Sequence, residues 1–331
     1  MMIKILLVGL GFMGSNHLKN LQILEAEGKV QVVALVDQDA ERLKNPSLPT
    51  YTDLTQAFLE TKPDIVCIAT STKSHYQILK TLAELSSSTA ILVEKPLTAT
   101  SAQAEEIIPS LKNRVVSCGY LFRESPAVEE AIEYLRGHPI SKIQTIWQKN
   151  RMEKGPPRPS EGVHIDEATH PIDLVMSDIL PRLGYTEKVV LEKWSSKRES
   201  EVGISIVDRK MQEALYADEP SKLDPVAEVE ALLRVGTIPI VTFSSFAKGP
   251  QRREIQITCT DGVRLVVRFD EKGKDWLETP IGVKSYPAGM KLLDEWRTFL
   301  HTYETGEKSP KSATLEDMLV DIQFTEKLAE H

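Results

Sequence analysis

The sequence is poor in cysteine and has no long apolar run. Its 331 residues include three cysteines, Cys67, Cys118 and Cys259, which lie far apart and form no Cys-x-x-Cys pair. This argues against a secreted fold held by disulfides and fits reduced core residues in a cytoplasmic protein. No apolar stretch reaches the length of a membrane-spanning helix, so we expect no membrane segment.

Basic charge is also scarce. The chain has 40 Lys and Arg against 48 Asp and Glu, a formal net charge of -8, and its basic residues form no cluster. A nucleic-acid partner is not expected, because such proteins ordinarily present a basic patch. The hydrophobic fraction of 41% is ordinary, and the length is sufficient for two domains that each have a core.

The most informative pattern present is the opening stretch. An apolar run at residues 3–8 ends at glycines spaced Gly-x-Gly-x-x-Gly, and leucines then recur at helical spacing. The glycines are Gly9, Gly11 and Gly14. This order of strand, glycine turn and helix is the context of a dinucleotide-binding site. The first glycine would allow the tight turn, the second a close approach to a pyrophosphate, and the third close packing of helix on strand. The pyrophosphate would rest on N–H groups at the helix start, near Phe12 and Met13.

An acidic residue supports this interpretation. The next strand-like run, residues 30–37, ends in Asp37, about 20 residues past the glycines, where a ribose-binding carboxylate is expected. A carboxylate there would repel the 2′-phosphate of NADP, so we expect NAD. The alternative is that Asp37 is only a surface acid after a buried strand.

Strands and helices alternate through the first third of the chain. Near-continuous apolar runs suit parallel strands that are covered on both faces. The expected strands are 3–8, 30–37, 64–70, 90–95 and 115–120, and helical patterns lie between them. This predicts an α/β Rossmann domain, a doubly wound parallel sheet, at 1–121.

The rhythm changes near residue 122. Helices are expected at 126–135 and 167–179, and strands at 140–149, 187–194, 202–208, 227–235, 238–246, 254–260 and 263–269. The tail returns to helix at 290–303 and 314–328. Successive strands without intervening helices indicate an antiparallel sheet. We therefore predict an α+β domain at 122–331 with a large, mainly antiparallel open sheet for substrate binding and oligomerisation. The C-terminal helix at 312–330 could pack back on the first domain.

Two stretches at predicted strand ends could line a cofactor cleft. The first holds Ala69, Thr70, Thr72 and His75. It could equally be a capped turn in which a hydroxyl begins the next helix. The second is Glu94-Lys95-Pro96. A lysine held in a cleft can polarise a carbonyl or stabilise an alkoxide, and the alternative is a surface ion pair.

A third stretch joins histidines to carboxylates at residues 162–173. On a helix, Asp166 and His170 would share a face, and a carboxylate near an imidazole makes it a plausible general base. Pro171 suits only the first helical turn, so the regular helix would begin near residue 169 or 170. Two alternatives stay open. His170 could be structural, or His164, Asp166 and His170 could be metal ligands.

In combination, these motifs resemble the Gfo/Idh/MocA family of NAD(P)-dependent oxidoreductases. The matching motifs, in chain order, are Gly9-x-Gly11-x-x-Gly14 with His17, Asp37, Ala69-Thr70-x-Thr72-x-x-His75, Glu94-Lys95-Pro96-Leu97, Gly119-Tyr120-x-x-Arg123 with Pro126, and Asp166-x-x-x-His170-x-x-Asp173. Two departures stand out. Ser71 lies where the family often has proline, and Gly162 is all that is left of a glycine run. For this reason no specific sugar is carried over.

The resemblance implies a function for these residues. It makes Lys95, Asp166 and His170 the catalytic trio, and it places Tyr120 and Arg123 on the substrate side. It also implies that no metal is used. Other polar residues that could bind substrate are His164, Lys149, Arg151 and Arg158.

The expected reaction is hydride transfer between NAD and a secondary alcohol or ketone of a cyclic polyol, sugar or sugar derivative. The alternatives are a non-catalytic NAD-binding regulator and a reductase of a non-sugar substrate. By resemblance we expect a homodimer or homotetramer formed through the C-terminal sheet.

Overall fold

The computed structural model describes residues 2–44, 47–149, 160–203, 207–246, 250–270 and 272–330. The chain forms two compact units. Unit 1 consists of Met1–Leu121 and Met290–Ile322, and unit 2 consists of Phe122–Gly289 and Gln323–His331. None of the described helices combines the length and the apolar character that crossing a bilayer requires.

Unit 1 contains a six-stranded sheet in the order β3-β2-β1-β4-β5-β6, with every pair parallel. The strands are β1 (Ile3–Val8), β2 (Val30–Val36), β3 (Thr50–Tyr51), β4 (Ile65–Ile68), β5 (Ala90–Val93) and β6 (Val116–Cys118). The helical segments are α1 (Phe12–Ala26), η1 (Ala40–Leu43), α2 (Leu54–Thr61), α3 (Thr72–Leu85), α4 (Ser101–Leu111), α11 (Lys291–Thr305) and the first half of α12 (Leu315–Ala329). This confirms the predicted Rossmann-type sheet.

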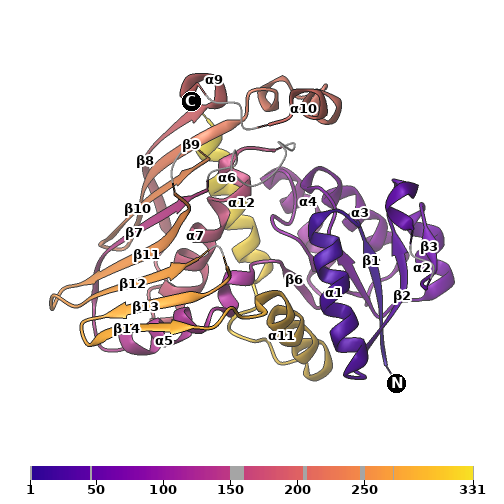
Figure 1. Cartoon of the computed structure of the whole chain (residues 1–331), viewed down its shortest axis with the longest axis horizontal. Helices are drawn as coiled ribbons and strands as arrows, with labels where there is room; N and C mark the ends of the chain where they lie inside the picture. The colour runs from indigo at the N-terminus through magenta and orange to yellow at the C-terminus, as the bar shows by residue number, and fades with distance from the viewer. Residues whose placement is uncertain are drawn as a thin grey trace. The chain divides into compact units, whose positions relative to one another are not determined.

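Both faces of this sheet are buried because alternate strand residues enter different cores. Ile5 and Leu7 pack with α1 and α11, whereas Leu6 and Val8 pack with α2, α3, α4 and the start of α12. Helices on both sides of the strands are visible in Figure 1. The continuous apolar character of the β1 sequence follows from this double burial.

The division of the chain differs from the one expected from the sequence. The break between residues 121 and 122 is the same, and the first half of α12 belongs to unit 1, as the expectation for the helix at 312–330 allowed, but α11 also belongs to unit 1. The reason is packing, because Leu293, Trp296 and Phe299 of α11 are buried in the core that β1 and α1 also line. The chain therefore returns to complete its first unit after the second has been built.

Unit 2 contains an eight-stranded sheet in the order β14-β13-β12-β11-β7-β10-β9-β8. The strands are β7 (Ile140–Gln148), β8 (Val189–Arg198), β9 (Val226–Val235), β10 (Ile238–Ser245), β11 (Arg252–Cys259), β12 (Arg264–Phe269), β13 (Asp275–Thr279) and β14 (Gly282–Tyr286). The pair β7 and β10 is parallel, and the other pairs are antiparallel. The expected large, mainly antiparallel sheet is confirmed.

The helical segments of unit 2 are η2 (Leu121–Glu124), α5 (Pro126–Leu135), α6 (Val163–Asp166), α7 (Thr169–Asp173), the π-helical segment η4 (Leu174–Ile179), α8 (Leu180–Arg182), α9 (Glu199–Val202), α10 (Arg209–Tyr216) and η5 (Pro220–Lys222). Four of these helices, α5, α6, α7 and α9, contact strands of the sheet, and the other helical segments connect to them (Figure 1). Ile255 and Ile257 are fully buried, whereas Val241 and Phe243 are only half-buried, and the strand register places the two pairs on opposite faces.

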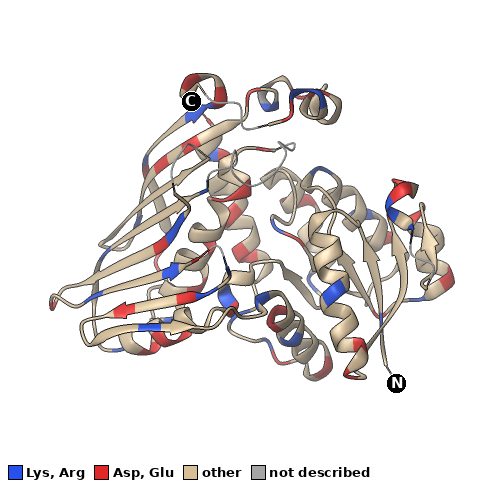
Figure 2. Ribbon diagram, viewed as in Figure 1, with Lys and Arg blue, Asp and Glu red and all other residues tan. Residues whose placement is uncertain are grey.

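The face of the sheet that includes Val241 and Phe243 also carries charges of both signs. Glu254 of β11 pairs with Arg252 of the same strand and with Arg268 of the neighbouring strand β12. Figure 2 shows acidic and basic residues interspersed along these strands. This face therefore mixes apolar side chains with compensated charge.

Three local expectations differ from the structure. The strand expected at 202–208 is absent where the chain is described, because Val202 ends α9 and Asp208 caps α10, while residues 204–206 lie outside the described residues. The polar strands β13 and β14 were not predicted. The helix expected at 167–179 begins at Thr169 and continues through η4 into α8.

Candidate functional site

The glycine turn of unit 1 has the geometry that its sequence predicts. Gly9 has a φ of 92°, and a Cβ built there would lie 2.7 Å from the Ala69 carbonyl carbon. A Cβ on Gly14 would lie 1.8 Å from the Gly9 carbonyl oxygen, so α1 can pack this closely only on a glycine. These two glycines are therefore required by the protein itself.

Gly11 is different, because packing within the protein does not require it. Its φ is -68°, and only Arg42 Nη1, 3.7 Å away, comes within 4 Å of a Cβ built there among the described residues. The small residue leaves backbone exposed at the start of α1, and the first turn of that helix, which is fully described, holds no acidic residue. Such a helix start favours an anion. These residues fit the pyrophosphate of a dinucleotide, with Phe12 and Met13 beginning the helix.

Asp37 lies beside this turn at the end of β2. Its Oδ2 accepts the Leu10 N–H at 2.7 Å, and its Oδ1 accepts the Asp39 N–H at 2.9 Å. The Arg42 guanidinium lies 3.9 Å from the same carboxylate. These contacts fix the carboxylate next to the glycine turn, where a ribose-binding acid is expected.

Two loops at neighbouring strand ends are joined by His75. The imidazole is completely buried, with Nδ1 2.9 Å from the Pro96 oxygen and Nε2 3.3 Å from the Thr70 oxygen. Burial lowers the pKa of His75. A neutral imidazole has one N–H and so donates to one of these two carbonyls at a time. His75 therefore lies between the two loops inside the unit, and its expected contact with a cofactor stays a prediction. Ala69 and Thr70 lie at the end of β4, and Thr72 begins α3.

Glu94 is held by a buried chain of hydrogen bonds. Its Oε1 lies 2.9 Å from His17 Nε2, and Trp296 Nε1 donates to His17 Nδ1 at 3.0 Å. An indole N–H only donates, so Nδ1 is the acceptor and the Nε2 proton of His17 goes to Glu94. A Cβ on Gly119 would lie 3.0 Å from Glu94 Oε2, so this glycine makes room for the carboxylate.

Lys95 follows Glu94 directly and is half-buried. Its peptide bond to Pro96 is cis. Tyr120, which follows Gly119 and was expected on the substrate side, is buried in one core of unit 1. Unit 1 therefore brings together the glycine turn, Asp37, the end of β4 and the Glu94-Lys95 pair at the carboxyl ends of its strands, where ligands bind in such sheets.

In unit 2, Asp166 is positioned by residues that are distant in sequence. The Ser160 hydroxyl donates to Asp166 Oδ2 at 2.6 Å, and the buried Gln212 of α10 bonds both the N–H and the carbonyl of Ser160. Gly162 N–H donates to the same hydroxyl at 3.0 Å. Asp166 is therefore fixed at the end of α6.

His164 lies beside this group. Its ring is buried, and Nδ1 has no hydrogen-bond partner among the described residues. Burial lowers the pKa of His164 to about 4, so the ring is neutral near pH 7. Gly162 has a φ of 116°, and a Cβ there would lie 2.7 Å from the His164 ring. This glycine is therefore needed both for its backbone and for the imidazole.

His170 lies half-buried among aromatic rings. Its ring centroid is 5.0 Å from that of Phe122, edge to face, and 6.2 Å from that of Trp147. The buried Glu167 one turn earlier pairs with Lys149 and with Arg253. The sequence did not point to Glu167, Arg253 or Phe122, because their role depends on contacts between distant segments. Lys149 was one of the residues that could bind substrate. Two others, Arg151 and Arg158, lie outside the described residues.

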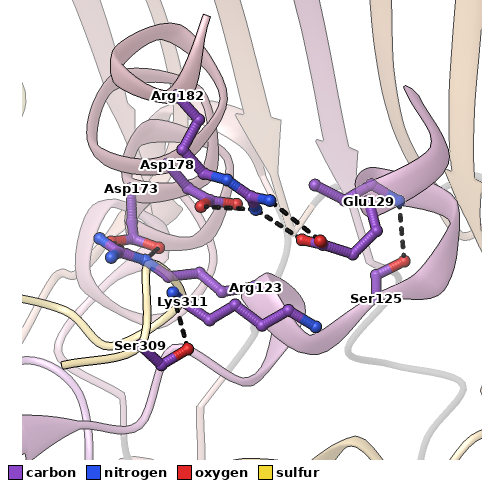
Figure 3. Close-up of polar contacts among 9 residues, drawn as sticks. Arg123, Ser125, Glu129, Asp173, Asp178, Arg182, Ser309 and Lys311 are labelled. Carbon is purple, nitrogen blue, oxygen red and sulfur yellow. Dashed lines mark hydrogen bonds and ion pairs between the residues drawn. The ribbon is translucent and has the colours of Figure 1, made fainter. Parts of the chain in front are cut away.

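Arg123 and Asp173 form a buried ion pair (Figure 3). Arg123 Nε lies 3.1 and 3.0 Å from the two carboxylate oxygens, and Nη2 also donates to Oδ1. The Arg123 side chain is 1% exposed and is paired with a carboxylate. Its expected contact with substrate stays a prediction. The described part of the chain contains no group of three or more potential metal ligands.

Known proteins resemble this chain at low identity. An inositol 2-dehydrogenase of Paenarthrobacter aurescens is 26% identical over 187 residues, which cover 53% of this chain and 55% of that protein. An inositol 2-dehydrogenase/D-chiro-inositol 3-dehydrogenase of Lactiplantibacillus plantarum is 25% identical over 72% of this chain and 73% of its own. The chain thus spans about half the length of the first relative.

The fold is shared with solved structures. An oxidoreductase from Agrobacterium radiobacter, solved with NAD+, L-tartaric acid and magnesium, superposes with a TM-score of 0.74 at 16% identity and covers 98% of this chain and 95% of its own. Residues 3–121 match the model of the GFO_IDH_MocA oxidoreductase family, NAD-binding Rossmann fold. The order of motifs in the sequence had indicated the same family. Residues 3–121 thus match the NAD-binding domain of the Gfo/Idh/MocA oxidoreductases, and the inositol dehydrogenases named above are similar to this chain.

Proposed function

We propose that this protein is an NAD-dependent dehydrogenase acting on a secondary alcohol of a cyclic polyol, sugar or sugar derivative. The observation that carries the proposal is Gly11, whose lack of a side chain is explained by a pyrophosphate and not by protein packing. The match of residues 3–121 to a family with an NAD-binding Rossmann fold supports it. Two relatives are named as inositol dehydrogenases, which favours a polyol or sugar as substrate.

Asp37 favours NAD over NADP. Its carboxylate is fixed by two backbone N–H groups beside the glycine turn, so it can accept hydrogen bonds from the adenosine ribose. The same negative charge would repel a 2′-phosphate. Arg42, 3.9 Å away, is exposed and partly offsets this charge.

Oxidation requires that a hydroxyl proton and a hydride leave the substrate as the carbonyl forms. Bound NAD would accept the hydride at nicotinamide C4. His170 would take the hydroxyl proton as general base, and Asp166 would stabilise the resulting charge. Lys95 would donate a hydrogen bond to the substrate oxygen and stabilise its developing negative charge.

Alanine variants of Lys95 and His170 test these roles. Each should bind NAD with unchanged affinity, measured by calorimetry, while polyol oxidation followed by NADH absorbance falls about a hundredfold or more. Near-normal turnover in either variant would remove that residue from the mechanism. Tight NAD binding without turnover of any polyol, sugar or non-sugar acceptor by the unaltered protein would favour a regulator.

We also propose that the sheet face carrying Val241 and Phe243 joins two copies of the chain. These apolar side chains are only half-buried within the protein, and the neighbouring charges are compensated by ion pairs, so burying this face would be inexpensive. Light scattering of the full chain should give a dimer or tetramer mass, and Val241→Asp should lower it. A single-chain mass at micromolar concentration would contradict this assembly.

A further inference from the structure

A cluster of ion pairs, here called the Glu167 cluster, is formed by Glu167, Lys149 and Arg253. Lys149 Nζ lies 3.0 Å from Glu167 Oε1, and Arg253 Nη2 lies 2.6 Å from Oε2. Both carboxylate oxygens are therefore bound by cations that come from two strands, β7 and β11. Glu167 is only 3% exposed. Burial opposes its ionisation, but Arg253 and Lys149 outweigh this and hold the pKa of Glu167 below its ordinary value. The side chain is thus a fixed anion.

This cluster is continuous with the surroundings of His170. The Arg253 guanidinium lies 5.8 Å from the centre of the Phe122 ring and 5.9 Å from that of Trp147. These are the two rings that contact the His170 imidazole. The His170 N–H donates to the Glu167 carbonyl at 3.2 Å, which keeps the two residues on one turn of chain. The two side chains interact electrostatically, because the charge of His170 is among those that lower the pKa of Glu167. Burial of Glu167 strengthens such an effect.

Other ionisable groups lie near His170 along the chain. Asp166, which accepts the Ser160 hydroxyl, has the charge-stabilising role in the proposed mechanism, and Asp173, one turn along α7, is paired with Arg123. The charge of His164 is removed by burial, which keeps its ring neutral. Glu167 is a further, buried carboxylate, and its partner Arg253 lies over the two aromatic rings that contact His170.

We propose that Glu167 is a positioning residue for His170: its fixed carboxylate stabilises the imidazolium formed when His170 accepts the substrate proton, and Lys149 and Arg253 limit that effect. This inference rests on the proposed function, in which His170 is the general base. It assigns opposite effects to neighbouring residues, because removing the anion and removing a cation change the local charge in opposite directions. If Glu167 only held β7 and β11 together, removing the anion and removing a cation would not shift the His170 pKa in opposite directions.

The test uses the pH dependence of the full protein with NAD and an oxidisable polyol. Glu167→Gln should move the acidic midpoint of kcat/KM to lower pH by about one unit, because the protonated form of His170 loses a stabilising charge. Arg253→Gln and the less buried Lys149→Gln should move it to higher pH. Histidine NMR titration of the same variants should show the His170 pKa shifting in the same directions, whether or not turnover is measurable.

Arg252→Gln is the matched control, since Arg252 neighbours Arg253 in sequence but pairs with Glu254. It should leave the midpoint unchanged. Midpoints and His170 titrations that stay in place, or that move in the same direction for Glu167→Gln and Arg253→Gln, would overturn the proposal. The dehydrogenase assignment would survive that result, because it depends on the loss of turnover in His170→Ala. If Arg253→Gln or Lys149→Gln fails to fold, the other still carries the expectation opposite to that of Glu167→Gln. If Glu167→Gln fails to fold, the two cation variants must still raise the His170 pKa, and an unchanged pKa in both would overturn the proposal.

Discussion

At the scale of single residues, we expect the choice between NAD and NADP to depend on one carboxylate and one guanidinium. Asp37→Ser removes the charge opposing a 2′-phosphate and leaves the exposed Arg42, which can accept one. We expect the ratio of kcat/KM for NADP to that for NAD to rise about tenfold or more, which corresponds to about 1.4 kcal/mol. Steady-state kinetics with both coenzymes would measure it.

The double variant Asp37→Ser with Arg42→Ala serves as the control. It should lose most of the gain with NADP, because the phosphate then meets no cation. An unchanged coenzyme ratio in Asp37→Ser would show that this carboxylate does not set the preference.

Local sequence predicted some residues of the site, but not their partners. The glycine spacing identified Gly9, Gly11 and Gly14 because their roles depend on backbone within a few residues. Glu167 could not be found in this way, since its importance comes from Lys149 and Arg253 on separate strands. The pairing of Arg123 with Asp173 could not be found for the same reason, because Asp173 lies fifty residues away in the chain.

At the scale of elements, η4 carries a carboxyl group in an unusual state (Figure 3). Burial raises the pKa of Asp178 to about 7 from its ordinary 3.8, although Arg123 and Arg182 oppose the shift. Arg182 is in turn held by both oxygens of Glu129 on α5. The folded protein therefore keeps a proton on Asp178 that the unfolded chain has already released between these two pH values.

This difference gives the unfolding free energy a definite pH dependence. The stabilisation by the retained proton is full below the unfolded pKa and is lost as pH rises through about 7. Relative to the wild type, Asp178→Asn should be more stable above pH 7, by a few kcal/mol at most, and the two should converge in acid. Urea unfolding at several pH values would measure this. The exposed Asp218→Asn should show no such trend, and a trend of opposite sign for Asp178→Asn would contradict the argument.

Elements were predicted where their sequences are strongly patterned. The parallel strands of unit 1 are continuous apolar runs because both faces are buried, and they were recognised. β13 and β14 were not, because Asp275–Thr279 and Gly282–Tyr286 have few apolar residues and are strands through pairing with β12 and each other. Propensity gives little information where neighbouring strands decide the structure.

At the scale of the whole molecule, the sequence indicated two domains of different fold, but not which segments build each of them. The change from alternating helices and strands to successive strands fell at residue 122, where the structure divides as well. The assignment of α11 could not be read from its sequence, because an amphipathic helix shows that one face is buried but not against what. Trp296 shows which core α11 packs against, because its ring is buried in unit 1 and its N–H donates a hydrogen bond to His17.

Trp296 is synthesised near the end of the chain, and this has a consequence for folding during translation. During translation the first unit emerges with one face of its sheet partly uncovered and with His17 lacking its indole partner. It can acquire its full core only after nearly three hundred residues have left the ribosome. Until then the nascent coenzyme-binding unit exposes apolar surface, and chaperones have most reason to hold it.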